Sequence, residues 1–117
     1  MSFPATYDFN YYIGDTQTMV LSPENSDGTQ FDLTNYTSAF IIASEKATIP
    51  AWSVDASVTI DNNELVCEIQ PSVGLQLEDG KRYFYDIDVR SNVGGIEKVY
   101  TLLRGQITAV VGVNRSA

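Results

Sequence analysis

Residues 75–113 read LQLEDGKRYFYDIDVRSNVGGIEKVYTLLRGQITAVVGV, and the expected architecture is built outward from them. From Tyr83 onward the side chains fall into two alternating sets, Tyr83, Tyr85, Ile87 and Val89 against Phe84, Asp86, Asp88 and Arg90. A period of two indicates a β-strand with one buried face and one solvated face. Residues 91–95 supply a turn, since two adjacent glycines adopt positive φ at no steric cost. Residues 96–111 return as a second strand, so the sequence predicts a β-hairpin.

The residues just before this hairpin carry the pattern of a tyrosine corner. Leu77, Gly80 and Tyr83 stand in the order L-x-D-G-x-x-Y. In immunoglobulin-like sandwiches, a Tyr near the start of a strand bonds through its hydroxyl to backbone a few residues upstream. Leu77 would fill the end of the core, Gly80 would permit the bend, and Tyr83 would pin the crossover formed by residues 70–78. The alternative is an ordinary Asp-Gly turn before a strand.

Length and composition predict a single globular domain over residues 1–117. Hydrophobic residues make up 44% of the chain and charged residues 19%, a balance that excludes a disordered tail. We expect residues 1–6, which include Pro4, to form a short N-terminal arm. No apolar run is long enough to cross a membrane, and the first residues lack a secretory signal, so no membrane contact is expected.

Five further segments show strand patterns, namely residues 7–12, 16–22, 37–43, 54–60 and 64–70. A tight turn at residues 61–63 would join the last two of these segments as a second hairpin. Residues 31–36 could form one helical turn that points Leu33 and Tyr36 inward. Together with the first hairpin, these segments predict an all-β fold, an immunoglobulin-like β-sandwich of about seven antiparallel strands.

The last strand is apolar on both of its faces. Val99, Thr101, Leu103, Ile107 and Ala109 share one parity, and Tyr100, Leu102, Thr108 and Val110 share the other. A strand with one solvated face would not carry this pattern. Either a β-bulge near Gly105 changes the register, or the far half of the strand is covered by another subunit.

The residue types present leave little room for catalysis. The chain has no His, which excludes Ser-His-Asp, Cys-His and His-ligated metal sites. The single cysteine, Cys67, is in phase with Leu65 and Ile69 and is predicted to be a buried thiol. Asp86 and Asp88 share a strand face and are expected to be solvating charges. We therefore expect no enzyme activity, no catalytic residue, no cofactor and no metal ion.

Charge and aromatic residues indicate which partners to expect. The net charge is −8, and the few basic residues are scattered, so nucleic-acid binding is not expected. Aromatic residues gather near the N-terminus, where they could line the core or form a surface for a protein or a sugar. The candidate partner-interface residues are Phe3, Tyr7, Tyr12, Trp52, Tyr100 and Val110.

Several short motifs, taken in order, resemble a family of phage proteins. They are YIGDT at residues 12–16, DG at 27–28, DLTNYT at 32–37, YDI at 85–87, TLLRGQI at 101–107 and VNR at 113–115. The pattern resembles the small immunoglobulin-like domains of tailed-phage baseplate and tail-fibre proteins, in particular the N-terminal domain of baseplate upper proteins. Asn35 stands where the family often has Gly, a substitution that a turn tolerates.

The resemblance implies a structural virion protein, a tail or baseplate adaptor or attachment module. Its partners would be other tail and baseplate proteins and copies of itself in a symmetric assembly, and it would occupy the host cytoplasm before assembly. Because the chain ends at Ala117, we expect no receptor-binding tip. The alternatives are a capsid decoration protein, or a carbohydrate-binding module that uses Trp52 and the N-terminal tyrosines.

Overall fold

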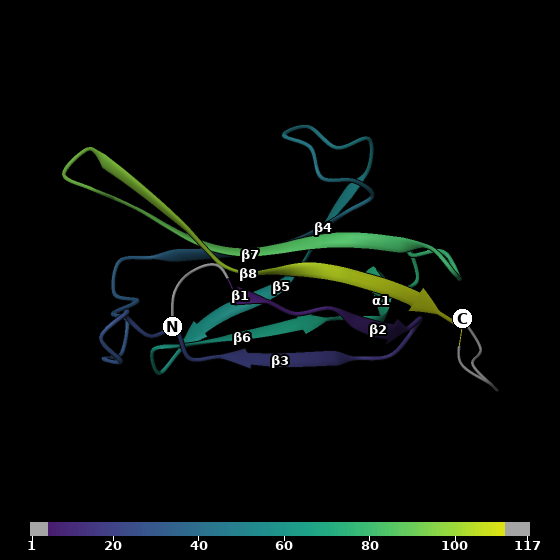
Figure 1. Ribbon diagram of the computed structural model, residues 1–117, viewed down its shortest axis with the longest axis horizontal. Coiled ribbons are helices and arrows are strands. Elements are labelled where there is room, and N and C mark those ends of the chain that lie inside the picture. Colours follow the sequence, from purple (N-terminus) through teal and green to yellow (C-terminus); the bar gives the residue numbers. More distant parts are fainter. Residues whose placement is uncertain (1–4, 112–117) are drawn as a thin grey trace.

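The computed structural model of the chain describes residues 5–111, and these residues form an all-β fold (Figure 1). In chain order the elements are β1 (Ala5–Thr6), β2 (Phe9–Tyr12), β3 (Gln17–Leu21), β4 (Thr37–Ala43), β5 (Ser53–Asp61), β6 (Glu64–Ile69), α1 (Pro71–Gly74), β7 (Arg82–Val93) and β8 (Ile96–Val110). The hairpin expected from the sequence is β7 and β8. The short helix α1 lies in the crossover between β6 and β7.

The strands form one continuous mixed sheet that curves into a half-barrel. The order is β1-β8-β7-β4-β5-β6-β3, and β2 also pairs with β8. Figure 1 shows β7 and β8 along one side of the molecule and β3 and β6 along the other. The strand β5 joins these two sides of the sheet, because its first half pairs with β4 and its second half pairs with β6.

The expectation of seven antiparallel strands is not confirmed, because β1 and β2 run parallel to β8. The expected first strand, residues 7–12, begins only at Phe9, as β2, and Ala5 and Thr6 of the expected N-terminal arm form a further short strand, β1, on β8. Along β2 the alternation of side chains buries Tyr11 and leaves Tyr12 exposed, and it would do so whether β2 ran parallel or antiparallel to β8. The side-chain pattern therefore carries no information about direction.

The core fills the concave side of this sheet. Its largest fully buried side chains come from five strands and from the start of one loop: Tyr11, Pro23, Phe40, Ile42, Leu65, Cys67, Ile69, Tyr83, Ile87, Val89 and Ile107. The predicted burial of Cys67 is confirmed. In β7 the buried residues are those of the predicted inward set, which confirms the face assignment of that strand.

A single side chain ties the long loop before β4 to the β5–β6 turn. Asn62 and Asn63 both have positive φ, the conformation expected of a tight hairpin turn. The Asn63 Oδ1 atom accepts a hydrogen bond from the Leu33 N–H at 2.7 Å, and its Nδ2 donates to the Phe31 carbonyl at 2.8 Å. The helical turn expected at residues 31–36 is instead a turn in which the Tyr36 N–H bonds to the Leu33 carbonyl, with Leu33 buried.

The three residues of the expected tyrosine corner lie where α1 leads into β7. The Glu78 N–H donates a hydrogen bond to the Tyr83 hydroxyl at 2.9 Å, five residues upstream of that Tyr. Leu77 and Tyr83 are buried, and Gly80 has a φ of 78° that favours glycine. The Gly80 N–H also donates to the Ala109 carbonyl, so the bend is anchored on β8 as well.

The register of β8 shifts once, but not at Gly105. The pairing with β7 is interrupted between Ile87 and Asp88, opposite Leu102, and the extra residue lets Leu102 and Leu103 both be buried. Gly105 has a different role. A Cβ atom there would overlap the Tyr7 carbonyl oxygen, so glycine is needed where the chain crosses from β1 to β2.

We expect Tyr83→Phe to lower the free energy of unfolding by about 1 kcal/mol, the net contribution of one hydrogen bond. The ring stays in place, but the Glu78 N–H loses its partner. Urea denaturation of both proteins would measure the difference. Tyr12→Phe is the matched control, because Tyr12 is half exposed and its hydroxyl has no hydrogen bond within residues 5–111. Equal stability of the Tyr83 variant and the unmodified protein would contradict a structural role for this hydroxyl.

Asn63→Gly should lower the free energy of unfolding by about 2 kcal/mol, because two hydrogen bonds to the loop are lost while the positive φ is kept. Asn62→Gly is the control, since it makes the same backbone change in the same turn without those bonds. The two variants should differ in urea midpoint. Similar midpoints would mean that the loop is held mainly by the burial of Leu33.

Candidate functional site

Two of the expected interface residues, Tyr12 and Val110, are direct neighbours on β2 and β8. Tyr7 and Tyr12 are half exposed, whereas Val110 is partly buried within β8. Trp52 is partly buried, and its ring packs against Tyr83 with centroids 5.5 Å apart. Phe3 lies outside the described residues.

Tyr100 belongs to an aromatic cluster at a different place. Its ring contacts Phe31 and Tyr36, with centroids 5.7 Å and 6.3 Å away. Both of those residues come from the long loop before β4. The cluster therefore packs that loop against β8, and Tyr100, which was expected at an interface, takes part in this packing while 37% of it stays exposed.

The most conspicuous surface is the end of the β7–β8 hairpin, residues 91–99, which we call the arm. Figure 1 shows the arm projecting away from the rest of the molecule. Pairing of β7 with β4 ends at Arg90, opposite Thr37. Beyond that point, residues 91–93 pair only with residues 96–98 within the described chain. The arm is therefore a two-stranded ribbon with both edges open.

The arm exposes apolar side chains as well as backbone. Val93 is 60% exposed and Ile96, its partner across the ribbon, is 64% exposed, and Val99 is exposed on the opposite face. An isolated two-stranded hairpin is at best marginally stable in water. Open edges are also a template on which another strand can pair. Exposed apolar side chains on such a ribbon are typical of a surface that a partner covers.

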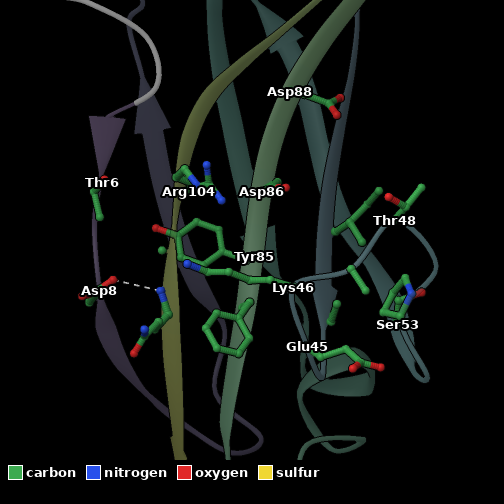
Figure 2. A pocket seen from close by; sticks show the side chains of 17 residues that line it. Thr6, Asp8, Glu45, Lys46, Thr48, Ser53, Tyr85, Asp86, Asp88 and Arg104 are labelled. Carbon is green, nitrogen blue, oxygen red and sulfur yellow. Dashed lines mark hydrogen bonds between the residues drawn. The ribbon is translucent and has the colours of Figure 1, made fainter.

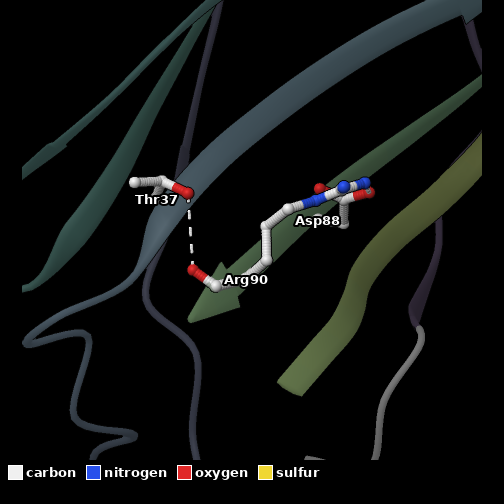
Figure 3. Close-up of polar contacts among 3 residues, drawn as sticks. All are labelled: Thr37, Asp88 and Arg90. Carbon is white, nitrogen blue, oxygen red and sulfur yellow. Dashed lines mark hydrogen bonds and ion pairs between the residues drawn. The ribbon is translucent and has the colours of Figure 1, made fainter. Parts of the chain in front are cut away.

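Polar contacts mark the base of the arm (Figure 3). The Thr37 hydroxyl donates to the Arg90 carbonyl at 3.4 Å, the last contact between β4 and β7. The Arg90 guanidinium lies 3.5 Å from Asp88 Oδ2. Because that Arg is half exposed, the ion pair contributes little to stability. Asp88 Oδ1 is buried and has no hydrogen-bond partner among the described residues.

The second surface is a groove of about 580 Å³ on the outer face of the sheet. Its floor is formed by β4, β7 and β8 (Figure 2). One wall is the loop 44–52, which a hydrogen bond from the Ala51 N–H to Glu45 Oε1 closes on itself. The other wall is the N-terminal segment at Thr6 and Asp8. The Asp8 carboxylate accepts a hydrogen bond from the Gln106 N–H, which fixes this wall on β8.

The floor of the groove carries charges of both signs. Asp86 and Arg104 are directly opposite each other on neighbouring strands. Within residues 5–111 neither side chain forms an ion pair with another residue. Lys46 reaches from the loop wall to lie over the Phe84 ring, with its nitrogen 5.3 Å from the ring centroid. The groove thus combines an aromatic surface with charges of both signs, and the acidic residues Asp8, Glu45, Asp86 and Asp88 outnumber the basic residues Lys46 and Arg104.

The charged side chains of the groove bear on whether a metal ion could bind there. In the part of the chain that the structure describes, no group of three or more His, Cys, Asp or Glu side chains is placed to hold a metal ion. The groove's acidic and basic groups come from two strands, β7 and β8, and from two other segments, the loop 44–52 and the N-terminal segment at Asp8. Such a surface can bind a partner through ion pairs and apolar contact.

No protein-family model matches this chain, and no curated protein is significantly similar to it. Within residues 5–111, no helix has the length and apolar character needed to cross a membrane.

Sequence reasoning missed the groove. It treated Asp86 as a solvating charge and gave no role to Lys46 or Arg104. The alternation of β7 placed Asp86 on the outer face, but the position of the loop 44–52 over that face had no signal in its polar composition. The turn of the arm was predicted, whereas its projection beyond the sheet was not.

Two core groups hold their protons more tightly in the folded protein. Burial raises the pKa of the Cys67 thiol to about 12. Burial, together with the Asp8 carboxylate, also raises the pKa of the Tyr85 hydroxyl, which donates a hydrogen bond to the Tyr7 carbonyl. Cys67 is buried in the core, whereas Tyr85 also lines the groove, where its hydroxyl holds the N-terminal wall through the Tyr7 carbonyl.

These raised pKa values predict a loss of stability in alkali. In the unfolded chain the thiol ionises near a pKa of about 8.5. Below that pH the thiol is protonated in both states, and the free energy of unfolding is unaffected. As the pH rises toward about 12, the unfolded state loses the proton first, so the free energy of unfolding falls.

Urea denaturation at several pH values between about 8 and about 10, a range that includes the unfolded-state pKa of the thiol, would measure this slope. Cys67→Ala is less stable throughout, because it leaves a cavity, but its slope should be flatter by about one proton. Equal slopes would show that this thiol does not titrate differently in the two states.

Proposed function

We propose that this chain is a structural protein of a tailed-phage virion, a tail or baseplate adaptor or attachment module. It acts by protein–protein assembly with copies of itself and with other tail proteins, without catalysis. The observation that carries the proposal is the arm, whose exposed Val93 and Ile96 flank open strand edges. Exposed apolar side chains beside open strand edges are suited to burial by a partner protein.

The proposal includes an immunoglobulin-like sandwich. Its support is the division of β5, which pairs first with β4 and then with β6. On that description β8, β7 and β4 form one layer and β6 and β3 form the other. The hydrogen bond to the Tyr83 hydroxyl agrees with the corner that such sandwiches carry.

The carbohydrate-binding alternative has less support. It depends on Trp52 and the N-terminal tyrosines acting together. The Trp52 ring is partly buried and packs on Tyr83, which is a core contact. Capsid decoration uses the same assembly surfaces and differs only in location, so the same experiment separates it from the tail assignment.

Quantitative mass spectrometry of purified particles, with heads and tails separated, tests the proposal. We expect the chain in the tail fraction at a copy number set by threefold or sixfold symmetry. The major tail protein and the major head protein are internal standards for each fraction. Hundreds of copies in the head fraction would instead identify a capsid decoration protein. Absence from the particle would overturn the virion proposal.

A further inference from the structure

The groove floor carries two carboxylates whose capacity to accept hydrogen bonds is not fully used within the chain. Asp86 is exposed, and its side chain forms no hydrogen bond or ion pair with another residue in 5–111. Asp88 Oδ1 is buried, and among the described residues it has no hydrogen-bond donor. The acidic residues of the walls differ from these, because Asp8 and Glu45 each accept a backbone N–H. A ligand with N–H donors would therefore find free acceptors on the floor.

Asp86 and Asp88 follow one another along the groove. Figure 2 shows β7 running between the two walls, with both of these labelled side chains on it. They are two residues apart on the same face of the strand, a separation of about 7 Å. An extended peptide has the same period of two, so its alternate side chains are also about 7 Å apart on one face. A segment that lies along β7 thus brings every second side chain to one of these carboxylates.

The aromatic part of the floor already holds a cation. Phe84 lies on the same face of β7, two residues before Asp86, and the Lys46 nitrogen is 5.3 Å from its ring centroid. Aromatic rings attract cations through their π electrons. A guanidinium suits this floor, because it stacks on rings and donates two parallel N–H bonds to a carboxylate. We propose that the groove binds an extended basic segment of a partner protein, with arginine at alternate positions.

The charge balance of the groove favours such a segment over an acidic one. Four carboxylates line the groove against two cations, Lys46 and Arg104, and the whole chain has a net charge of −8. The resulting negative potential attracts basic segments and repels acidic ones. Lys46 and Arg104 oppose the binding, so removal of either charge should strengthen it. The inference deepens the proposed function, on which it rests, by giving the chemistry of the partner protein.

Peptide titration of the purified chain tests this site. The probe is acetyl-Gly-Arg-Gly-Arg-Gly-amide, and acetyl-Gly-Glu-Gly-Glu-Gly-amide is its acidic counterpart. In about 0.05 M salt, where screening is weak, we expect the arginine peptide to shift the amide NMR signals of residues 84–88 and the acidic peptide to leave them unchanged. Asp86→Asn with Asp88→Asn should weaken binding by about tenfold or more. Arg104→Gln should strengthen binding by about threefold, because a competing cation is removed.

Asp61→Asn with Glu97→Gln is the matched control. It also removes two negative charges, from exposed residues outside the groove, so binding of the arginine peptide should change by less than about twofold. Equal weakening by the two pairs of substitutions would overturn the proposal, because it would show attraction to net charge alone. Weaker binding after Arg104→Gln, or tighter binding of the acidic peptide, would overturn it as well. So would the absence of shifts with the arginine peptide at concentrations up to about 5 mM.

Asp86→Asn alone keeps the test decisive if the double variant unfolds. Asp86 is exposed, so this substitution leaves the core unchanged, and the urea midpoint should match that of the unmodified chain. We expect the folded variant to bind the arginine peptide more weakly by about threefold or more, and unchanged affinity would contradict the proposal. Because the titration uses purified protein and the mass spectrometry uses particles, the basic-segment site can fail while the virion assignment stands, and the reverse.

Discussion

The ladder between β7 and β8 is the interaction on which the rest of the structure depends. It joins a strand of 12 residues to one of 15 residues, the two longest elements of the fold. The β7 strand provides the edge for β4, and β8 provides the edge for β1 and β2. Neither set of partners covers the full length of the hairpin. The arm is the part that these shorter strands leave uncovered.

The curvature of the sheet follows from the way its ends are fastened. The N-terminal segment crosses β8 at Gly105, where the missing side chain admits the Tyr7 carbonyl. At the other end, hydrogen bonds from Asn63 hold the loop before β4 against the β5–β6 turn. The first of these contacts also positions one wall of the groove, because the segment at Tyr7 continues into Asp8.

Local sequence patterns predicted the elements far better than their spatial relations. The strand at residues 37–43 was predicted with the bounds of β4, and the inward set of β7 is buried as expected. Alternation is the same in parallel and antiparallel strands, so it did not reveal that β2 runs parallel to β8. The groove depends on where the loop 44–52 settles, and that loop has no periodic pattern. Its position is a property of tertiary packing.

The arm exposes both backbone edges and apolar side chains to water, so its burial by a partner would be favourable. Within residues 5–111 its two strands pair only with each other, and Val93 and Ile96 are more than half exposed. Such segments open at low free-energy cost, and a partner that orders them must offset that cost from its own contact. Each single contact is therefore expected to be weak. In a symmetric assembly, several weak contacts together hold more firmly than one, because each raises the effective concentration for the next.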